Sequence, residues 1–243
     1  MPQLDIVIPV YNEEHVLAGS VQRIQSYLDE HEFPYSWRIV IADNASTDGT
    51  LAAAQGLAER LDDVAAIHLP QKGRGRALRK AWLESDADAV CYMDVDLSTD
   101  LAALLPLARA VLEEGYDVAS GSRMTRGSQI TRSLRRETTS RGFIFLIKLL
   151  FLSKLSDTQC GFKALARKAA QELLPRVENE EWFFDTELLL AEKGGYRVKE
   201  VPVRWVEDQD SRVAVLKTVV EDLRGLLRMR FRRIPRRGES GPN

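Results

Sequence analysis

Two aspartates one residue apart, Asp94 and Asp96, are the strongest candidates for chemistry in this sequence of 243 residues. They follow an apolar run, residues 89–93, that has the composition of a buried strand. Paired carboxylate oxygens suit a hard divalent cation such as Mg²⁺ or Mn²⁺, which can also hold a diphosphate. The pattern therefore predicts a metal site, and the rival interpretation is an acidic turn in which Asp100 caps a helix.

Two further segments are candidate ligand-binding loops. Residues 43–50 follow a second apolar run, and Asp43 could accept the N–H of a nucleobase, although Asp, Asn and Gly are also ordinary turn formers. Residues 72–77 bring three cations to the start of a predicted helix, which favours an anion. This loop departs from the dinucleotide-binding fingerprint because Leu78 replaces the third glycine, and a solvated basic turn is the alternative.

Two regions of the second half are rich in arginine. Six arginines occur between residues 123 and 141 against one acid, Glu137, and a planar guanidinium suits phosphate oxygens. An apolar segment, residues 143–152, follows directly. It could form a core helix or a helix at a lipid surface, and the adjoining arginines favour the lipid surface.

The second arginine-rich region lies near the C-terminus. There apolar residues alternate with Arg224, Arg228, Arg230, Arg232, Arg233, Arg236 and Arg237, with no acid among them. This predicts a basic amphipathic helix on anionic lipid, and the alternatives are nucleic-acid binding and a juxtamembrane segment of a longer protein. No recognised nucleic-acid module accompanies the basic run, so we expect no nucleic-acid partner.

Strands and helices must bring these segments together. Segments of helical spacing separate four short apolar runs, which are residues 4–9, 38–42, 65–69 and 89–93. This alternation predicts βαβ units and a parallel sheet covered by helices, with ligands bound at the carboxyl ends of the strands. Further on we expect helices over residues 101–114 and 183–193, and a strand over residues 196–205.

Composition sets limits on the class of protein. The length and the 44% of hydrophobic residues fit one globular domain with attachments, and the net charge of −2 gives no global signal for nucleic acid or membrane. Cys91 and Cys160 lack metal or disulfide-framework spacing, which favours a reducing cytosol. The early apolar run leaves no room for a signal peptide, and the longest apolar stretch is about half of a membrane span. We expect no passage through the bilayer.

Taken in order, these segments resemble family 2 glycosyltransferases with the GT-A fold, and within them the polyprenyl- and dolichyl-phosphate sugar synthases. The matching motifs lie at residues 7–14, 42–50, 72–75, 93–98, 121–123, 136–142, 157–163 and 182–189. The last two look especially like dolichyl-phosphate β-glucosyltransferases. Cys160-Gly161-Phe162 stands where many relatives have Gly-Gly-Phe, and the membrane helices that many relatives append are missing, so the mode of membrane attachment is open.

The resemblance implies a role for each matching position. The donor nucleotide sugar would be held by Pro9, Tyr11, Glu13, Asp43, Gly73, Arg74, Asp94, Asp96 and Arg212. The metal ligands would be Asp94, Asp96 and Ser98. The acceptor phosphate would be held by Arg123, Arg136, Ser140, Asp157 and Lys163, and the catalytic set would be Asp94, Asp96, Arg123 and Arg136.

The function implied is inverting transfer of a sugar from a nucleotide diphosphate sugar to polyprenyl phosphate at the cytoplasmic face of a membrane. UDP-glucose is the favoured donor; the alternatives are GDP-mannose, a UDP-N-acetylhexosamine, and transfer to a sugar hydroxyl instead. A homo-oligomer is among the expectations. A sugar nucleotidyltransferase would place a Gly-rich loop where residues 11–14 stand, and retention of Asp94 and Asp96 speaks against a non-catalytic nucleotide-binding module at a membrane.

The predicted architecture is α/β, a Rossmann-like GT-A fold with a mainly parallel sheet flanked by helices. Residues 1–212 would form it, with a nucleotide-sugar half over residues 1–122 and an acceptor half over residues 123–212. Residues 213–235 would form the basic amphipathic helix at the membrane surface, and residues 236–243 a disordered tail.

Overall fold

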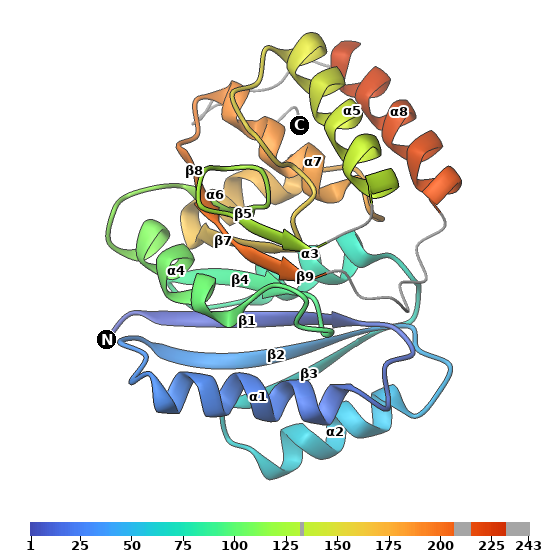
Figure 1. Cartoon of the computed structure of the whole chain (residues 1–243). Coiled ribbons are helices and arrows are strands. Elements are labelled where there is room, and N and C mark those ends of the chain that lie inside the picture. The colour runs from blue at the N-terminus through green and yellow to red at the C-terminus, as the bar shows by residue number, and fades with distance from the viewer. Residues whose placement is uncertain (132–133, 207–214, 232–243) are drawn as a thin grey trace.

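A seven-stranded sheet forms the centre of the computed structural model, which describes residues 1–131, 134–206 and 215–231, with side chains except at 131, 134–137, 139, 191, 192 and 215–219. The strand order is β3-β2-β1-β4-β7-β5-β8 (Figure 1). The strands are β1 (Gln3–Val10), β2 (Ser36–Asn44), β3 (Val64–Leu69), β4 (Ala89–Met93), β5 (Val118–Ser122), β7 (Phe162–Ala166) and β8 (Val198–Pro202). Strand β7 runs antiparallel to β4 and β5, and the other pairs are parallel. The prediction of a mainly parallel α/β sheet is confirmed.

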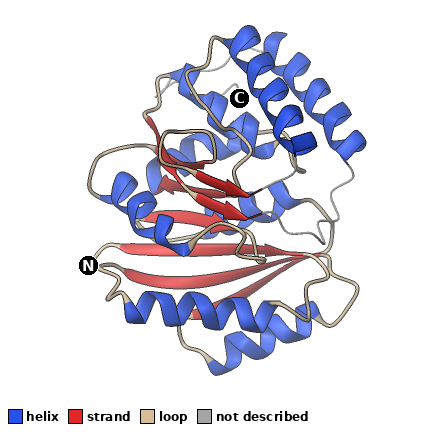
Figure 2. Cartoon of the chain, viewed as in Figure 1, coloured by secondary structure: helices blue, strands red, loops and turns tan. Residues whose placement is uncertain are grey.

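Helices cover both faces of this sheet (Figure 2). One face packs against α1 (Leu17–Glu30), α2 (Thr50–Arg60) and α4 (Leu104–Leu112), and the other against α3 (Arg74–Glu84), α6 (Arg167–Leu173) and α7 (Phe184–Leu189). Successive side chains of a strand point to opposite faces. Accordingly Ile6 and Ile8 of β1 lie in the first core, and Val7 lies in the second. Burial on both faces explains why these strands are continuously apolar.

Two long helices, α5 (Leu134–Phe151) and α8 (Val215–Phe231), lie side by side outside the sheet (Figure 1). A third apolar cluster joins them to α7, and its buried members are Ile147, Phe183, Leu190, Leu226 and Met229. The predicted basic C-terminal helix is therefore present as far as Phe231, whereas residues 232–243, including the predicted tail, lie outside the described residues. Within the described residues, no helix is long and apolar enough to cross a membrane.

The prediction of one strand over residues 196–205 is wrong, because this segment forms two strands that belong to two different sheets. Strand β8 belongs to the main sheet, and β9 (Arg204–Val206) pairs with β6 (Gln129–Thr131). Val203 lies between them. Its N–H donates to Ser122 of β5 and its carbonyl accepts from Gln129 of β6, so the chain changes sheets at this residue. The expected helices over residues 101–114 and 183–193 are each divided into an α-helix and a 3₁₀ turn, η1 (Leu101–Ala103) before α4 and η3 (Leu190–Gly194) after α7.

Candidate functional site

The predicted ligand residues meet at the carboxyl ends of β1, β2 and β4. The loops after β1 and β2 are tied together, because the N–H of Asn12 donates to Ser46 Oγ at 3.0 Å and Asn12 Oδ1 accepts from the N–H of Thr47 at 2.8 Å. Asn12, Ala45 and Leu97 follow these three strands, and each has a positive φ, between 50° and 60°. Such a conformation costs about 1–3 kcal/mol in a residue other than glycine and is concentrated at functional sites. Three of the five non-glycine residues with a positive φ in the described part of the chain thus lie at the edge of the sheet that the sequence predicted.

Asp43, at the end of β2, is completely buried, and one of its carboxylate oxygens has no hydrogen-bond partner among the described residues. Its Oδ2 lies 2.7 Å from Nδ1 of His68, whereas its Oδ1 has no hydrogen-bond partner among the described residues. A buried acceptor without a partner is costly, so Oδ1 suits a donor brought by a ligand, such as the N–H of a nucleobase. Sequence reasoning assigned no role to His68. The contact depends on the register of β2 and β3, which pairs Asp43 with His68 and which the sequence does not specify.

Arg74 opens α3 and connects Asp94 to a second carboxylate. Its two terminal nitrogens donate to Asp94 Oδ1 at 2.6 Å and to Asp185 Oδ2 at 2.7 Å. The guanidinium carbon also lies 4.9 Å from the ring centre of Tyr92 and 4.7 Å from that of Trp182. Burial alone would lower the pKa of Arg74, but the neighbouring acids, first Asp94, raise it well above its ordinary value. Arg74 is therefore a fixed cation at the predicted metal carboxylate.

Gly73 and Tyr11, two other residues predicted to hold the nucleotide, lie at the same edge. The N–H of Gly73 donates to Asn44 Oδ1 at 2.6 Å, next to Asp43 in β2. Gly73 has no room for a side chain, since a Cβ would lie 2.8 Å from the carbonyl oxygen of Glu180. Lys72 Nζ lies 3.4 Å from the ring centre of Tyr11 and adds a cation beside the ring.

Asp185, on α7, forms ion pairs with Arg74 and Lys163. Sequence reasoning did not predict this residue. Lys163 Nζ lies 3.0 Å from its Oδ1, and the Tyr92 hydroxyl donates to the same oxygen. Burial would raise the pKa of Asp185, but Lys163 and Arg74 lower it overall. Lys163, which was predicted to contact the acceptor, has other partners in this structure. Its side chain is fully buried and bound to Asp185 and the Cys160 carbonyl, so it supports the site from below.

Asp94 and Asp96 present different surroundings. Asp96 is exposed, and its Oδ1 accepts from the N–H of Ser98 at 2.9 Å. Asp94 packs closely against Gly161. A Cβ at residue 161 would lie 1.8 Å from Asp94 Oδ2, so only glycine fits at this position. Burial, offset in part by Arg74 and reinforced by Asp96, raises the pKa of Asp94.

These two carboxylates fit a cation that arrives with its substrate. Among the described residues, no group of three or more His, Cys, Asp or Glu side chains is arranged to hold a metal ion. Mg²⁺ usually takes one or two carboxylates and completes its shell with phosphate oxygens and water. The hard oxygens of Asp94 and Asp96 are a donor set of this kind, and a bound cation would offset their mutual repulsion.

Arg123 follows β5 and is held by a bidentate ion pair. Its Nε and NH2 atoms lie 2.7 and 3.0 Å from Asp157 Oδ2 and Oδ1, and its backbone N–H also donates to Asp157 at 3.1 Å. Burial would raise the pKa of Asp157, but Arg123 lowers it to about 2. Burial would lower the pKa of Arg123, but Asp157 raises it overall, and Asp94 adds a smaller upward contribution. The structure buries the carboxylate of Asp157 against Arg123, and the predicted contact of Asp157 with the acceptor stays a prediction.

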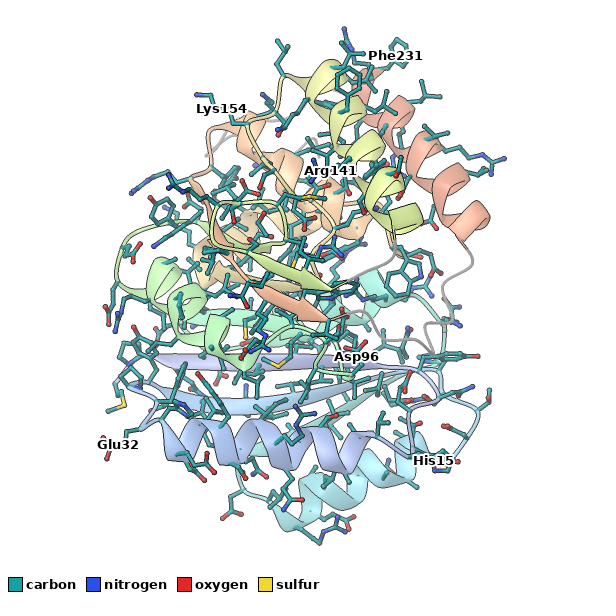
Figure 3. All side chains as sticks on the ribbon, viewed as in Figure 1. His15, Glu32, Asp96, Arg141, Lys154 and Phe231 are labelled. Carbon is teal, nitrogen blue, oxygen red and sulfur yellow. The ribbon has the colours of Figure 1, made fainter. Side chains whose placement is uncertain are left out.

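The other predicted acceptor residues are placed only in part. Arg136 belongs to α5, and its side chain lies outside the described part of the chain. Ser140 is half-buried on the same helix, one turn further on. Arg212, predicted to reach the donor diphosphate, lies outside the described residues. Figure 3 shows Asp96 at the end of the central sheet, with Arg141 on α5 above it.

Comparison with known proteins gives one consistent match. Residues 5–174 match the family model described as "Glycosyl transferase family 2". Glycosyltransferase AglD of Haloferax volcanii is 34% identical over 224 residues, which are 90% of this chain and 35% of AglD, so the chain spans about a third of that relative. The dolichyl-phosphate beta-glucosyltransferase of Mus musculus is 30% identical over 95% of this chain and 75% of its own length.

Solved structures agree on the fold. Glucosyl-3-phosphoglycerate synthase from Mycobacterium tuberculosis, crystallised with Mn²⁺ and UDP-glucose, superposes with a TM-score of 0.68 at 17% identity. The match covers 94% of this chain and 79% of that one. At this identity the likeness establishes the architecture, and the predicted GT-A fold is confirmed.

Proposed function

Because the chain belongs to glycosyl transferase family 2, as the sequence motifs predicted, we propose that it transfers glucose from UDP-glucose to a polyprenyl phosphate such as dolichyl phosphate. The relatives named dolichyl-phosphate beta-glucosyltransferase support the sugar and the acceptor. The neighbour crystallised with Mn²⁺ and UDP-glucose supports the donor. The observation that carries the proposal is geometric: Asp43, whose buried Oδ1 has no partner among the described residues, and Asp94, held by the cation of Arg74, lie at the carboxyl ends of two strands that both pair in parallel with β1.

The donor is expected to bind across the ends of β1, β2 and β4. The unpaired Oδ1 of Asp43 would accept an N–H of the base, and the ring of Tyr11 would line the same end of the sheet. A divalent cation held by Asp94 and Asp96 would supply a Lewis acid that offsets charge on the departing diphosphate. Arg74, fixed on Asp94, adds a second positive charge that needs no reorganisation during the reaction.

The acceptor needs placement more than activation. A lipid phosphate is already largely ionised near neutral pH, so it needs no strong general base to act as a nucleophile. Two anions must nevertheless approach to roughly 3–3.5 Å, and cations must offset their repulsion. The ion pair with Asp157 holds Arg123 in one orientation for this task, and we propose Arg136 and Ser140 as further acceptor contacts. Direct attack by the phosphate would invert the anomeric centre.

The paired helices α5 and α8 give the lipid a surface on which to lie. Large apolar side chains are exposed on both helices and directly after α5. The most exposed are Phe145 (68%) and Leu149 (64%) on α5, Leu152 (80%) just beyond it, and Leu227 (57%) and Phe231 (86%) on α8. Figure 3 shows Phe231 at the outer end of α8. Arg224 and Arg230 are exposed on the same helix, which suits anionic headgroups. We propose that this surface, which we call the lipid-facing surface, contacts the cytoplasmic face of a membrane.

One arginine predicted for the membrane has another partner. Arg228 NH2 donates to Glu187 Oε2 at 2.7 Å, and Glu187 is buried. Replacing Arg228 would therefore disturb the packing of α8 on α7 as well as any lipid contact. Arg224 and Arg230 are the cleaner positions at which to test charge.

The acceptor assignment is tested with Arg136→Ala, with Arg126→Ala as the matched control, because Arg126 is exposed on the neighbouring loop. Loss of a charge-assisted contact, about 1.5–3 kcal/mol, should reduce glucose transfer to polyprenyl phosphate tenfold or more. Slow hydrolysis of UDP-glucose and its binding should stay unchanged, and the control should match the wild type. If Arg136→Ala weakens donor binding and spares the acceptor, the division into donor and acceptor residues is wrong.

A further inference from the structure

Asp222, on α8, is a buried carboxylate with few hydrogen bonds. It is 4% exposed, its Oδ2 accepts from Gln159 Nε2 at 2.8 Å, and its Oδ1 has no partner among the described residues. An ionised carboxylate can accept about four hydrogen bonds, and burying one with fewer is costly. Burial, offset in part by Gln159 and reinforced by Glu221, raises the pKa of Asp222 to about 7. A carboxylate buried with one hydrogen bond among the described residues is costly to keep, which calls for a role outside stability.

Gln159 lies in the loop that joins the two halves of the site. Its backbone N–H donates to Asp157 Oδ1 at 3.0 Å, the carboxylate that holds Arg123. Two residues further on, Gly161 packs directly against Asp94. A displacement of Gln159 would therefore move the support of Arg123 and the wall beside Asp94 together.

Close packing fixes the position of α8 relative to this loop. Gly225, one turn after Asp222, lies on the ring of Phe183, and a Cβ there would come within 2.4 Å of a ring carbon. On the same side of the helix, Glu221 Oε1 accepts from Asn179 Nδ2 at 3.2 Å. The carboxylate of Asp222 is thus held at a set distance from Gln159.

We propose that Asp222 is a positioning residue that fixes the loop of residues 157–161 through Gln159 and so makes α8 part of the catalytic unit. The effect on the reaction rests on the proposed function. Helix α8 then has two functions on opposite sides, since its exposed side carries Leu227 and Phe231 of the lipid-facing surface. The reaction would depend on the helix even with an acceptor too short to need a membrane.

The test compares Asp222→Ala, Gln159→Ala, the double variant and the conservative Asp222→Asn. The control is Asp29→Ala, because Asp29 is an exposed aspartate on α1. Misplacement of a catalytic group by about 1 Å can cost roughly a hundredfold. We expect kcat to fall about tenfold to a hundredfold in Asp222→Ala. The KM for UDP-glucose should stay unchanged, and the melting temperature should be unchanged or higher. Asp222→Asn keeps an acceptor oxygen for Gln159 and should recover most of the rate.

Residues that act through one contact are not additive, so the double variant should lose no more than either single variant. Amide hydrogen exchange over residues 157–161 should be faster in Asp222→Ala, and this measurement needs no substrate. Unchanged exchange and unchanged kcat would each overturn the proposal, as would a double variant whose loss is the product of the two single losses. If the wild type transfers no glucose to polyprenyl phosphate, the proposed function fails, and the exchange rates still decide the role of Asp222.

Discussion

Replacing Asp185 by asparagine should destabilise the fold strongly, because this carboxylate is the shared partner of two buried cations. Arg74 donates to it at 2.7 Å and Lys163 lies 3.0 Å away, while only 2% of the Asp185 side chain and none of that of Lys163 are exposed. An asparagine of the same shape leaves both cations without their common negative charge. Arg74 keeps Asp94 as a partner, so the larger penalty falls on Lys163.

Removing one partner of a buried ion pair costs about 3–5 kcal/mol. In a chain of this size 1 kcal/mol shifts the melting temperature by roughly 2–4 °C. Asp185→Asn should therefore melt at least about 6 °C below the wild type, with a matching loss in urea denaturation followed by circular dichroism. Asp62→Asn is the matched control, since Asp62 is exposed, and it should stay within about 0.5 kcal/mol of the wild type.

The pH dependence separates this electrostatic loss from a packing defect. The pKa of Asp185 is lowered in the folded protein, so its stabilising effect is present above the ordinary pKa of an aspartate and is lost as the pH falls through the folded value. The gap between wild type and Asp185→Asn should therefore be full at pH 7 and narrow below about pH 4. A variant within 1 kcal/mol of the wild type at pH 7, or a gap independent of pH, would refute the role given to Asp185.

Three further changes test the rest of the site and its surroundings. Asp96→Asn should reduce Mn²⁺-dependent glucose transfer on the order of a hundred- to a thousandfold with an unchanged melting temperature, and full turnover would remove the metal assignment. Asp43→Asn should weaken UDP-glucose binding at least about tenfold in calorimetry, the effect of losing a hydrogen bond to a charged acceptor; an unchanged Kd would exclude Asp43 from the base site. The double variant Leu227→Ser, Phe231→Ser should lower binding to anionic vesicles about tenfold or more, because each apolar side chain buried in lipid contributes about 1.5–3 kcal/mol. The control Leu83→Ser, at an exposed leucine of α3, should leave vesicle binding unchanged. Equal losses in both variants would show that binding does not depend on the lipid-facing surface.

The strands β1 to β4 and the positions of Asp43 and Asp94 could be predicted from the sequence, because they depend on local patterns. Each strand is a short apolar run, and each aspartate stands where such a run ends. In a parallel sheet these ends lie at one edge whatever the intervening loops do. The family motifs then assigned chemistry to the residues gathered there. The family match confirms the family, and the roles of the single residues stay predictions.

The supporting residues beneath the site could not be predicted in this way. Asp185 is 111 positions from Arg74 and 93 from Tyr92, so the contacts exist only after the sheet and α7 have packed. Lys163 was predicted as an acceptor contact because it lies in a motif shared with the family, and the motif gives no information about its burial. Its burial follows from the insertion of β7 between β4 and β5, which no local pattern specifies.

The most direct measurement of the proposed activity is a product assay with the purified chain, Mn²⁺, dolichyl phosphate in detergent, and UDP-glucose labelled in the sugar. Parallel reactions contain labelled GDP-mannose or a UDP-N-acetylhexosamine, and Asp96→Asn supplies the inactive control. We predict label in a lipid-soluble, acid-labile glucosyl phosphate from UDP-glucose alone, formed by the wild type and not by Asp96→Asn. Label that stays in the aqueous phase, that enters the lipid from another donor in preference, or that enters it equally with Asp96→Asn would contradict the transfer of glucose from UDP-glucose to a lipid phosphate at this site.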